Sequence, residues 1–276
     1  MSLNMDVVID TPDATVDMKS GLESLQGVSD AARCIAEAIL TGNVPERQSH
    51  KSDVRTILKQ SFSGSYGQIF SIDIFHEQVQ KKFNKIGRPA FVELIAYFLN
   101  EAVYKEHKEL SDKAQRVVDE LGDKADDLVA QLRKSPLHHL HEVPMKFGYD
   151  VKVRYRKSRV DQTELARFDQ KTAESLQAKL DPKVVPVVVA ITRLNINTGN
   201  GRLAVKGEFD TVAFGFPMPY IRVLPGIKKV ISENLNYNNG RDSLLWRHLH
   251  ITAQPLKLPD GRVVKYIIKE IKEVPI

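Results

Sequence analysis

Apolar and polar positions alternate most clearly in residues 184–216, which predict three consecutive strands. β-Branched residues begin the segment, and a Gly- and Asn-rich stretch follows at 197–201. A second alternating run covers 202–206, and a third covers 211–216. The intervening stretch supplies residues that accept positive φ, as a turn between antiparallel strands requires. The pattern therefore predicts an antiparallel sheet.

A further hairpin is predicted nearer the C-terminus. Residues 245–258 and 262–271 alternate on either side of Pro259-Asp260-Gly261, and Asp-Gly between alternating strands is a strong hairpin signal. Before it, residues 225–234 predict a helix and 234–240 an Asn-rich loop. Five or six strands with one helical insertion predict a small barrel or a rolled sheet.

The N-terminal half is predicted to be rich in helices. Apolar residues three and four apart predict helices at 16–40, 89–107 and 108–133. Short strands are expected at 7–9, 54–58 and 69–74, the last two flanking a Gly/Ser-rich turn at 61–67. The amphipathic 108–133 helix is expected to pack on its own domain, and a short coiled-coil contact in a homodimer is the alternative.

A domain boundary is predicted within residues 133–150, which carry two prolines, three histidines and a glycine. The prediction is a helix-rich, acidic α+β domain at 1–145 and a basic antiparallel β domain at 146–276. In the second domain, 151–159 predicts a strand and 162–180 a helix leading to the sheet. The predicted fold class is α+β.

Charge divides the chain in the same way. Residues 1–145 carry 17 Lys and Arg against 22 Asp and Glu, a balance of −5, whereas 146–276 carry 23 against 13, a balance of +10. Such asymmetry indicates that the second half meets an anionic partner: a protein, a nucleic acid or lipid headgroups. A soluble surface that happens to be basic explains the same balance.

Composition indicates the compartment. The single cysteine, Cys34, forms no intramolecular disulfide, so a reducing, cytoplasmic location is expected. We expect no transmembrane segment, since no apolar run approaches about 18 residues, and no signal peptide.

The most basic feature is the predicted strand at 151–159. Its alternation puts Lys152, Arg154 and Arg156 on one face. Tyr155, Tyr220, Tyr237 and Trp246 are candidate stacking surfaces for single-stranded nucleic acid. The predicted anion-binding residues are Lys152, Arg154, Arg156, Lys157, Arg159, Arg193, Arg202, Lys206 and Arg247.

Two histidine clusters are the other candidates for chemistry. His138, His139 and His141 with Glu142 are potential metal ligands, but they lie in the Pro-bounded segment, and we predict no metal. His250-Ile251-Thr252 has the His-x-Thr form of two-histidine phosphoesterases, whose second motif would have to be His50-Lys51-Ser52. A surface strand bearing histidines is the simpler interpretation.

No common catalytic motif occurs. G-x-S-x-G, H-E-x-x-H, Walker A and G-x-G-x-x-G are all missing from the sequence. Cys34 lies in an apolar helix beside a single basic residue, Arg33, which is not the setting of a reactive thiolate. Enzymatic activity is unsupported, and no cofactor or catalytic residue is predicted.

Several segments resemble an uncharacterised family of bacterial two-domain proteins. They are the N-terminal strand with its Asp-rich turn, Gly21-Leu22-Glu23-Ser24-Leu25-Gln26-Gly27, Gly64-Ser65-Tyr66, and Ile191-Thr192-Arg193-Leu194-Asn195-Ile196-Asn197-Thr198-Gly199. The resemblance implies a helical α/β N-terminal domain, a small barrel-like C-terminal domain and a role in defence against phage.

The leading hypothesis is a non-catalytic interaction protein, a sensor or adaptor in phage defence, whose basic C-terminal face contacts an anionic target. A nucleic-acid-binding module, a protein that binds anionic membrane surfaces, and a two-histidine or metal-dependent phosphoesterase are the alternatives.

Overall fold

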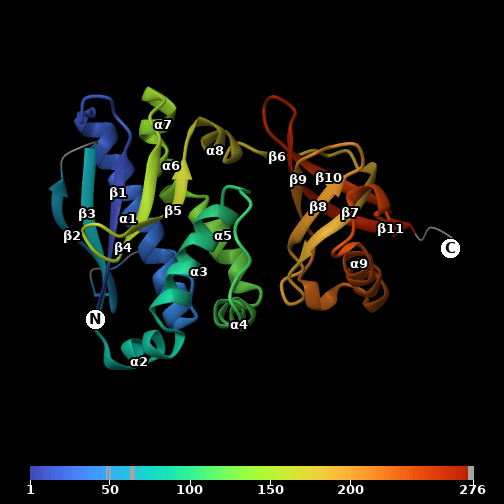
Figure 1. Ribbon diagram of the computed structural model, residues 1–276, viewed down its shortest axis with the longest axis horizontal. Helices are drawn as coiled ribbons and strands as arrows, with labels where there is room; N and C mark the ends of the chain where they lie inside the picture. Colours follow the sequence, from blue (N-terminus) through green and yellow to red (C-terminus); the bar gives the residue numbers. More distant parts are fainter. Residues whose placement is uncertain (48, 50, 63–65, 273–276) are drawn as a thin grey trace. The chain divides into compact units, whose positions relative to one another are not determined.

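The chain forms two compact units, Met1–Leu176 and Gln177–Ile276, drawn in Figure 1. A computed structural model describes residues 1–47, 49, 51–62 and 66–272. Both units combine helices with sheet, so the predicted α+β class is confirmed. Within the described chain, no helix has the length and apolar character needed to cross a membrane.

Unit 1 (1–176) is built on a five-stranded antiparallel sheet, sheet A, with strand order β2-β3-β1-β4-β5. Its strands are β1 (Ser2–Ile9), β2 (Val54–Phe62), β3 (Tyr66–Ile74), β4 (Val151–Arg156) and β5 (Gln162–Phe168). Its helices are α1 (Met18–Thr41), α2 (Glu77–Ile86), α3 (Arg88–Glu101), α4 (Asp112–Leu121), α5 (Lys124–Leu132), α6 (Ser135–Leu140), α7 (Glu142–Phe147) and α8 (Gln170–Ser175).

One face of sheet A forms the core with the helices. Period two in β1 turns Leu3, Met5 and Val7 to this face, where they join the buried residues of α1 and α3 in one cluster. The intervening residues, Asn4 and Asp6, point to the opposite face, which we call the outer face of sheet A. Figure 1 shows the helices gathered on one side of the sheet.

The predicted helix at 108–133 is two helices. Gly122, with φ of 53°, ends α4, and α5 begins at Lys124. The apolar stripes of both helices, which include Val118 and Leu128, are buried in the unit 1 core. These contacts support packing of the segment on its own unit.

The boundary between the units lies later in the chain than the predicted 145/146. Residues 133–150 form α6 and α7, and α6 packs so closely on α1 that a Cβ on Gly27 would lie 2.1 Å from the Leu140 backbone nitrogen. The next segment returns to sheet A, because β4 pairs with β1 with Val7 opposite Val153. The segment predicted as a helix at 162–180 begins with β5 and continues as α8 and β6 (Lys179–Leu180).

The observed boundary at 176/177 gives each unit a different charge balance from the one expected for a boundary at 145/146. Residues 1–176 carry 25 Lys and Arg against 27 Asp and Glu, a balance of −2, whereas 177–276 carry 15 against 8, a balance of +7. Unit 2 (177–276) is therefore the basic part of the sequence, although the strand that first suggested a basic face belongs to unit 1.

Unit 2 is a closed five-stranded barrel. The sheet order is β11-β9-β8-β7-β10-β6, and pairing of β10 with β11 closes the ring. The strands are β7 (Val185–Leu194), β8 (Gly201–Val205), β9 (Thr211–Gly215), β10 (Leu249–Lys257) and β11 (Val263–Lys272). β9 and β11 are parallel, and helix α9 (Pro225–Asn238) lies in the chain between the third and fourth barrel strands. This connectivity is that of the OB-fold, a five-stranded Greek-key barrel.

The strands and hairpin predicted in unit 2 are confirmed, and the Asn-rich loop is corrected. Residues 234–238 continue α9, because Asn234 and Asn238 are buried and hydrogen-bonded within the unit. The chain then passes through a short 3-10 helix, η2 (Ser243–Leu245), before β10 begins at Leu249. A second 3-10 helix, η1 (Tyr220–Arg222), precedes α9.

Candidate anion-binding sites

The nine predicted anion-binding residues lie in both units. Five come from β4 and the turn after it in unit 1: Lys152, Arg154, Arg156, Lys157 and Arg159. Four belong to unit 2: Arg193 on β7, Arg202 on β8, Lys206 after β8, and Arg247 before β10. The predicted set is therefore two groups, each with its own surroundings.

The cations of β4 have carboxylate partners on β1. Asp6 is fully buried on the outer face of sheet A, where its two oxygens accept hydrogen bonds from Arg154 Nε at 2.6 Å and Arg156 Nη1 at 2.8 Å. Lys152 forms an ion pair with Asp10, the residue that follows β1. The alternation predicted for this strand is confirmed, but its charge is largely balanced within unit 1.

A groove lies on the outer face of sheet A, beyond these pairs. Its cavity volume is about 750 Å³. The residues that line it come from β1, β3, the ends of β2 and β4, and the turn between β4 and β5: Asn4, Lys59, Gln60, Ser61, Phe62, Ile69, Arg156, Lys157, Ser158 and Arg159. Four of them are cations, and none of these described lining residues carries a carboxylate.

Two local features shape the groove. β2 has one extra residue between Leu58 and Ser61 relative to β3, a β-bulge that includes Lys59 and Gln60, and bulges redirect side chains. The Phe62 ring lies so close to Gly67 that a Cβ there would be 2.3 Å from ring carbons. The guanidinium carbon of Arg156 is 5.2 Å from the centroid of the same ring. The predicted turn at 61–67 includes residues 63–65, which lie outside the described residues.

Among the barrel cations, Arg202 is structural. Its side chain is buried, with Nε donating to Thr211 Oγ1 at 2.7 Å and Nη2 donating to the Thr211 carbonyl at 2.6 Å. It therefore ties β8 to β9. Lys206 is exposed, and its charge helps desolvation to lower the pKa of His248. Arg193 is half-buried beside a bulge between β7 and β8.

Arg247 belongs to an aromatic–cation cluster at the C-terminal end of α9. Its guanidinium carbon lies 3.7 Å from the Tyr237 ring centroid, and that of Arg241 lies 4.4 Å from the same centroid. Trp246 Nε1 donates to the Arg241 carbonyl at 3.0 Å. Both arginines are exposed, whereas both aromatic residues are half-buried. We call these four residues the Tyr237 cluster.

Two buried asparagines hold the backbone at this cluster. Asn238 Oδ1 accepts the Arg247 N–H at 2.9 Å, and Asn238 Nδ2 donates to the Arg247 carbonyl at 3.0 Å. Asn234 donates to the same carbonyl and accepts the N–H of Ile191 on β7. The position of Arg247 is thus fixed relative to both α9 and the barrel.

The sequence interpretation named Tyr237, Trp246 and Arg247 but missed Arg241 and Lys59. Tyr237 and Arg241 are four residues apart across the end of a helix, a spacing that brings side chains together. The contact between them could therefore have been predicted from the sequence. No sequence pattern predicts the position of the Lys59 side chain, because its orientation depends on a bulge in the pairing of β2 with β3.

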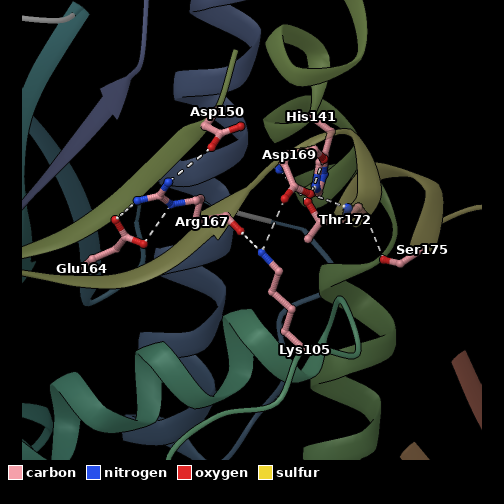
Figure 2. A network of polar contacts seen from close by, with 8 residues as sticks. All are labelled: Lys105, His141, Asp150, Glu164, Arg167, Asp169, Thr172 and Ser175. Atoms are coloured by element: carbon pink, nitrogen blue, oxygen red, sulfur yellow. Dashed lines mark hydrogen bonds and ion pairs between the residues drawn. The ribbon is translucent and has the colours of Figure 1, made fainter. Parts of the chain in front are cut away.

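The His138–Glu142 segment lies in α6, α7 and the turn between them, and His141 is part of the unit 1 interior. Figure 2 shows its imidazole beside Thr172, which forms the capping box of α8 with Asp169. Nδ1 lies 2.7 Å from the Leu137 carbonyl and Nε2 lies 2.9 Å from Thr172 Oγ1. Burial lowers the pKa of His141 to about 4, so the ring is neutral at pH 7. Both ring nitrogens are engaged, which leaves neither for a metal.

Charged side chains around α8 complete this network in Figure 2. Lys105 Nζ donates to the Arg167 carbonyl at 2.7 Å and lies 3.9 Å from Asp169 Oδ2. Arg167 in turn pairs with Glu164 at 3.0 Å and with Asp150 at 3.5 Å. The contacts hold α8 and β5 together, and we assign them a structural role.

The remaining chemical candidates gain no support. Among residues 1–47, 49, 51–62 and 66–272, no group of three His, Cys, Asp or Glu side chains is placed to hold a metal ion. His250 lies exposed on β10, and His50, its predicted partner motif, lies outside the described residues. Cys34 is buried, and desolvation raises the pKa of its thiol to about 12, so it behaves as a core residue.

No family model matches the chain, and neither a curated protein nor a solved structure matches it. Of what the resemblance implied, the structure shows the two-part α+β architecture with a C-terminal barrel.

Proposed function

We propose that this protein is a non-catalytic binding protein whose second unit holds a single-stranded nucleic acid. The observation that carries the proposal is the Tyr237 cluster, in which two exposed arginines flank one aromatic ring. Arginine binds phosphate through a planar fork of N–H donors and also stacks on bases, and aromatic rings give base-stacking surfaces that every base can use.

The charge and fold of unit 2 support the same proposal. Its balance of +7 provides a long-range attraction for phosphates. Its barrel has OB-fold connectivity, and many barrels of that connectivity bind oligonucleotides. That second support is an analogy of fold and not a property of particular residues.

The Tyr237 cluster is also prepared for binding before any ligand arrives. Asn234 and Asn238 fix the Arg247 backbone from within the unit, so less ordering is needed when a strand binds. A preorganised group loses less entropy on binding than a flexible one. This favours direct contact between Arg247 and the strand over general attraction by a mobile basic surface.

The experiment is a titration of the full chain with a fluorescent 12-nucleotide oligothymidylate, followed by anisotropy across a salt series. We expect affinity to fall steeply with salt. The Arg241→Gln, Arg247→Gln double variant should bind about a hundredfold more weakly or worse, since each of the two charged contacts contributes roughly 1.5–3 kcal/mol. Its salt dependence should also flatten by about 0.7 in log–log slope for each phosphate that the variant no longer neutralises.

The matched control is Lys269→Gln with Lys272→Gln, which removes the same charge from exposed positions on β11. Equal loss of affinity in both double variants would reduce the binding to net charge and overturn the role of the Tyr237 cluster. Binding to vesicles containing phosphatidylserine without oligonucleotide binding would instead favour the membrane-surface alternative.

The wider role, a sensor or adaptor in defence against phage, remains a prediction of the resemblance. It is tested by recovery of the tagged protein from its host with and without phage, with nucleic acid, lipid and protein measured in the same eluate.

A further inference from the structure

We propose that the groove on the outer face of sheet A binds a nucleoside di- or triphosphate. The proposal concerns unit 1 and does not depend on nucleic-acid binding by unit 2. It begins from the size of the groove: a cavity of about 750 Å³ lies within the range of roughly 300–1,000 Å³ that is typical of small-molecule sites.

The charges in the groove determine which kind of small molecule fits. Arg156 and Lys157 each have a carboxylate partner, Asp6 at 2.8 Å and Asp161 at 3.4 Å. The side chains of Lys59 and Arg159 have no ion pair with any residue that the structure describes. Two cations are thus left to meet a ligand, and a terminal phosphate carries a charge near −2 at pH 7.

Arg156 is held in a position suited to phosphate. Its Nη1 is anchored by the fully buried carboxylate of Asp6, while the guanidinium has five N–H donors in a rigid fork. Within the described part of the chain, Asp6 provides its only side-chain hydrogen bond. The remaining donors are therefore available to phosphate oxygens without any reorganisation of the side chain.

The walls of the groove favour a nucleotide over inorganic polyphosphate. Phe62 and Ile69 supply apolar surface, and Asn4 and Gln60 supply amides able to pair with a base or a ribose hydroxyl. A polyphosphate alone would leave these groups without a binding partner. The β-bulge that turns Lys59 and Gln60 is a local departure from regular pairing of a kind found beside binding sites.

The test is isothermal titration calorimetry of the full chain with ATP, ADP, AMP and tripolyphosphate. We expect ATP and ADP to bind more tightly than AMP, because AMP lacks the second phosphate, and more tightly than tripolyphosphate, which lacks the nucleoside. The Lys59→Gln, Arg159→Gln double variant should lose about tenfold or more in ATP affinity. Both side chains are exposed, so its circular dichroism and Tm should match those of the wild type.

Two control variants test whether a loss of ATP affinity is specific to the groove. Lys85→Gln with Lys113→Gln removes the same charge from exposed positions on α2 and α4, and it should leave ATP affinity unchanged. Arg241→Gln with Arg247→Gln should also leave it unchanged, even if oligonucleotide binding disappears.

Three results would overturn the proposal. The first is no heat with ATP or ADP at millimolar concentration. The second is equal affinity for ATP and tripolyphosphate, which would show that the groove does not recognise the nucleoside. The third is equal loss of ATP affinity in the groove variant and in the α2 and α4 control.

Discussion

Two pairs of arginines, one pair in each unit, have different partners. On β4, Arg154 and Arg156 share the fully buried carboxylate of Asp6. At the end of α9, Arg241 and Arg247 face the Tyr237 ring, and neither is ion-paired with a residue that the structure describes. Asp6 fixes its two arginines in the fold and neutralises part of their charge, whereas the Tyr237 ring leaves the charge of Arg241 and Arg247 unbalanced. Cations in a sequence therefore indicate a binding face only once their partners are known.

The largest effect is expected from Asp6→Asn. It removes the charge that balances two arginines, and breaking a buried ion pair costs about 3–5 kcal/mol. Because Arg154 and Arg156 keep some contact with solvent, we expect unit 1 to lose about 3 kcal/mol of unfolding free energy. Chemical denaturation followed by far-UV circular dichroism measures it, and Trp246 fluorescence separately reports unit 2, which contains the sole tryptophan.

Asp161→Asn is the control for this substitution. Asp161 and its partner Lys157 are both exposed, so we expect a loss below about 1 kcal/mol. A similar loss in both variants would mean that Asp6 is no more important than a surface carboxylate, and the contrast between the units would fail.

Acidification is expected to act on unit 1 through His141. Its pKa is about 4 in the folded chain, below the ordinary value near 6.5, so between these pH values the unfolded chain binds more protons. The stability that the neutral ring contributes is present above pH 6.5 and is lost as pH falls towards 4. The loss amounts to about 3 kcal/mol at most. Urea unfolding at several pH values should show this slope in the wild type and a smaller one in His141→Gln.

Within unit 2, Asn238→Ala should have a moderate effect. It removes the Asn238 acceptor of the Arg247 N–H and one of the two amide donors to the Arg247 carbonyl, and an unsatisfied polar group costs about 1–3 kcal/mol. Trp246 fluorescence during unfolding measures the loss. Oligonucleotide affinity should fall as well, since only Asn234 would still hold the Arg247 backbone. Unchanged affinity would show that this preorganisation is unimportant.

The smallest change in stability is expected for Arg241→Gln with Arg247→Gln. Exposed cation–π contacts contribute about 0.5–1 kcal/mol each, so unit 2 should remain folded with a Tm only a few degrees lower. A loss as large as that of Asp6→Asn would show that these arginines are structural too, and the proposed binding role would lose its basis.

Local patterns predicted much of the fold. Alternation identified β4 and the barrel strands, and three-four spacing identified α1 and α3, because these signals depend on neighbours along the chain. β5 was missed because its sequence, Gln-Thr-Glu-Leu-Ala-Arg-Phe, contains residues that favour helices. Pairing with β4 makes it a strand, and that contact is not visible in the local pattern.

The candidate sites were less predictable, because they depend on contacts distant in sequence. Asp6 and Arg156 are 150 positions apart, so the alternation of β4 showed its cations but not their partner. The Tyr237–Arg241 contact is local and was within reach of helical spacing. Trp246 and Arg247 approach α9 only because buried asparagines join the helix to the next segment.

Closure of the barrel by β11 also determines when its strands can pair during protein synthesis. β11 is the neighbour of both β9 and β10, so these two strands keep open edges until residues 263–272 leave the ribosome. Unit 1 is complete at Leu176, and at about 5–20 residues per second the remaining chain takes roughly 5–20 s to make. During that interval the nascent barrel strands have unpaired edges, and they are candidates for protection by a chaperone.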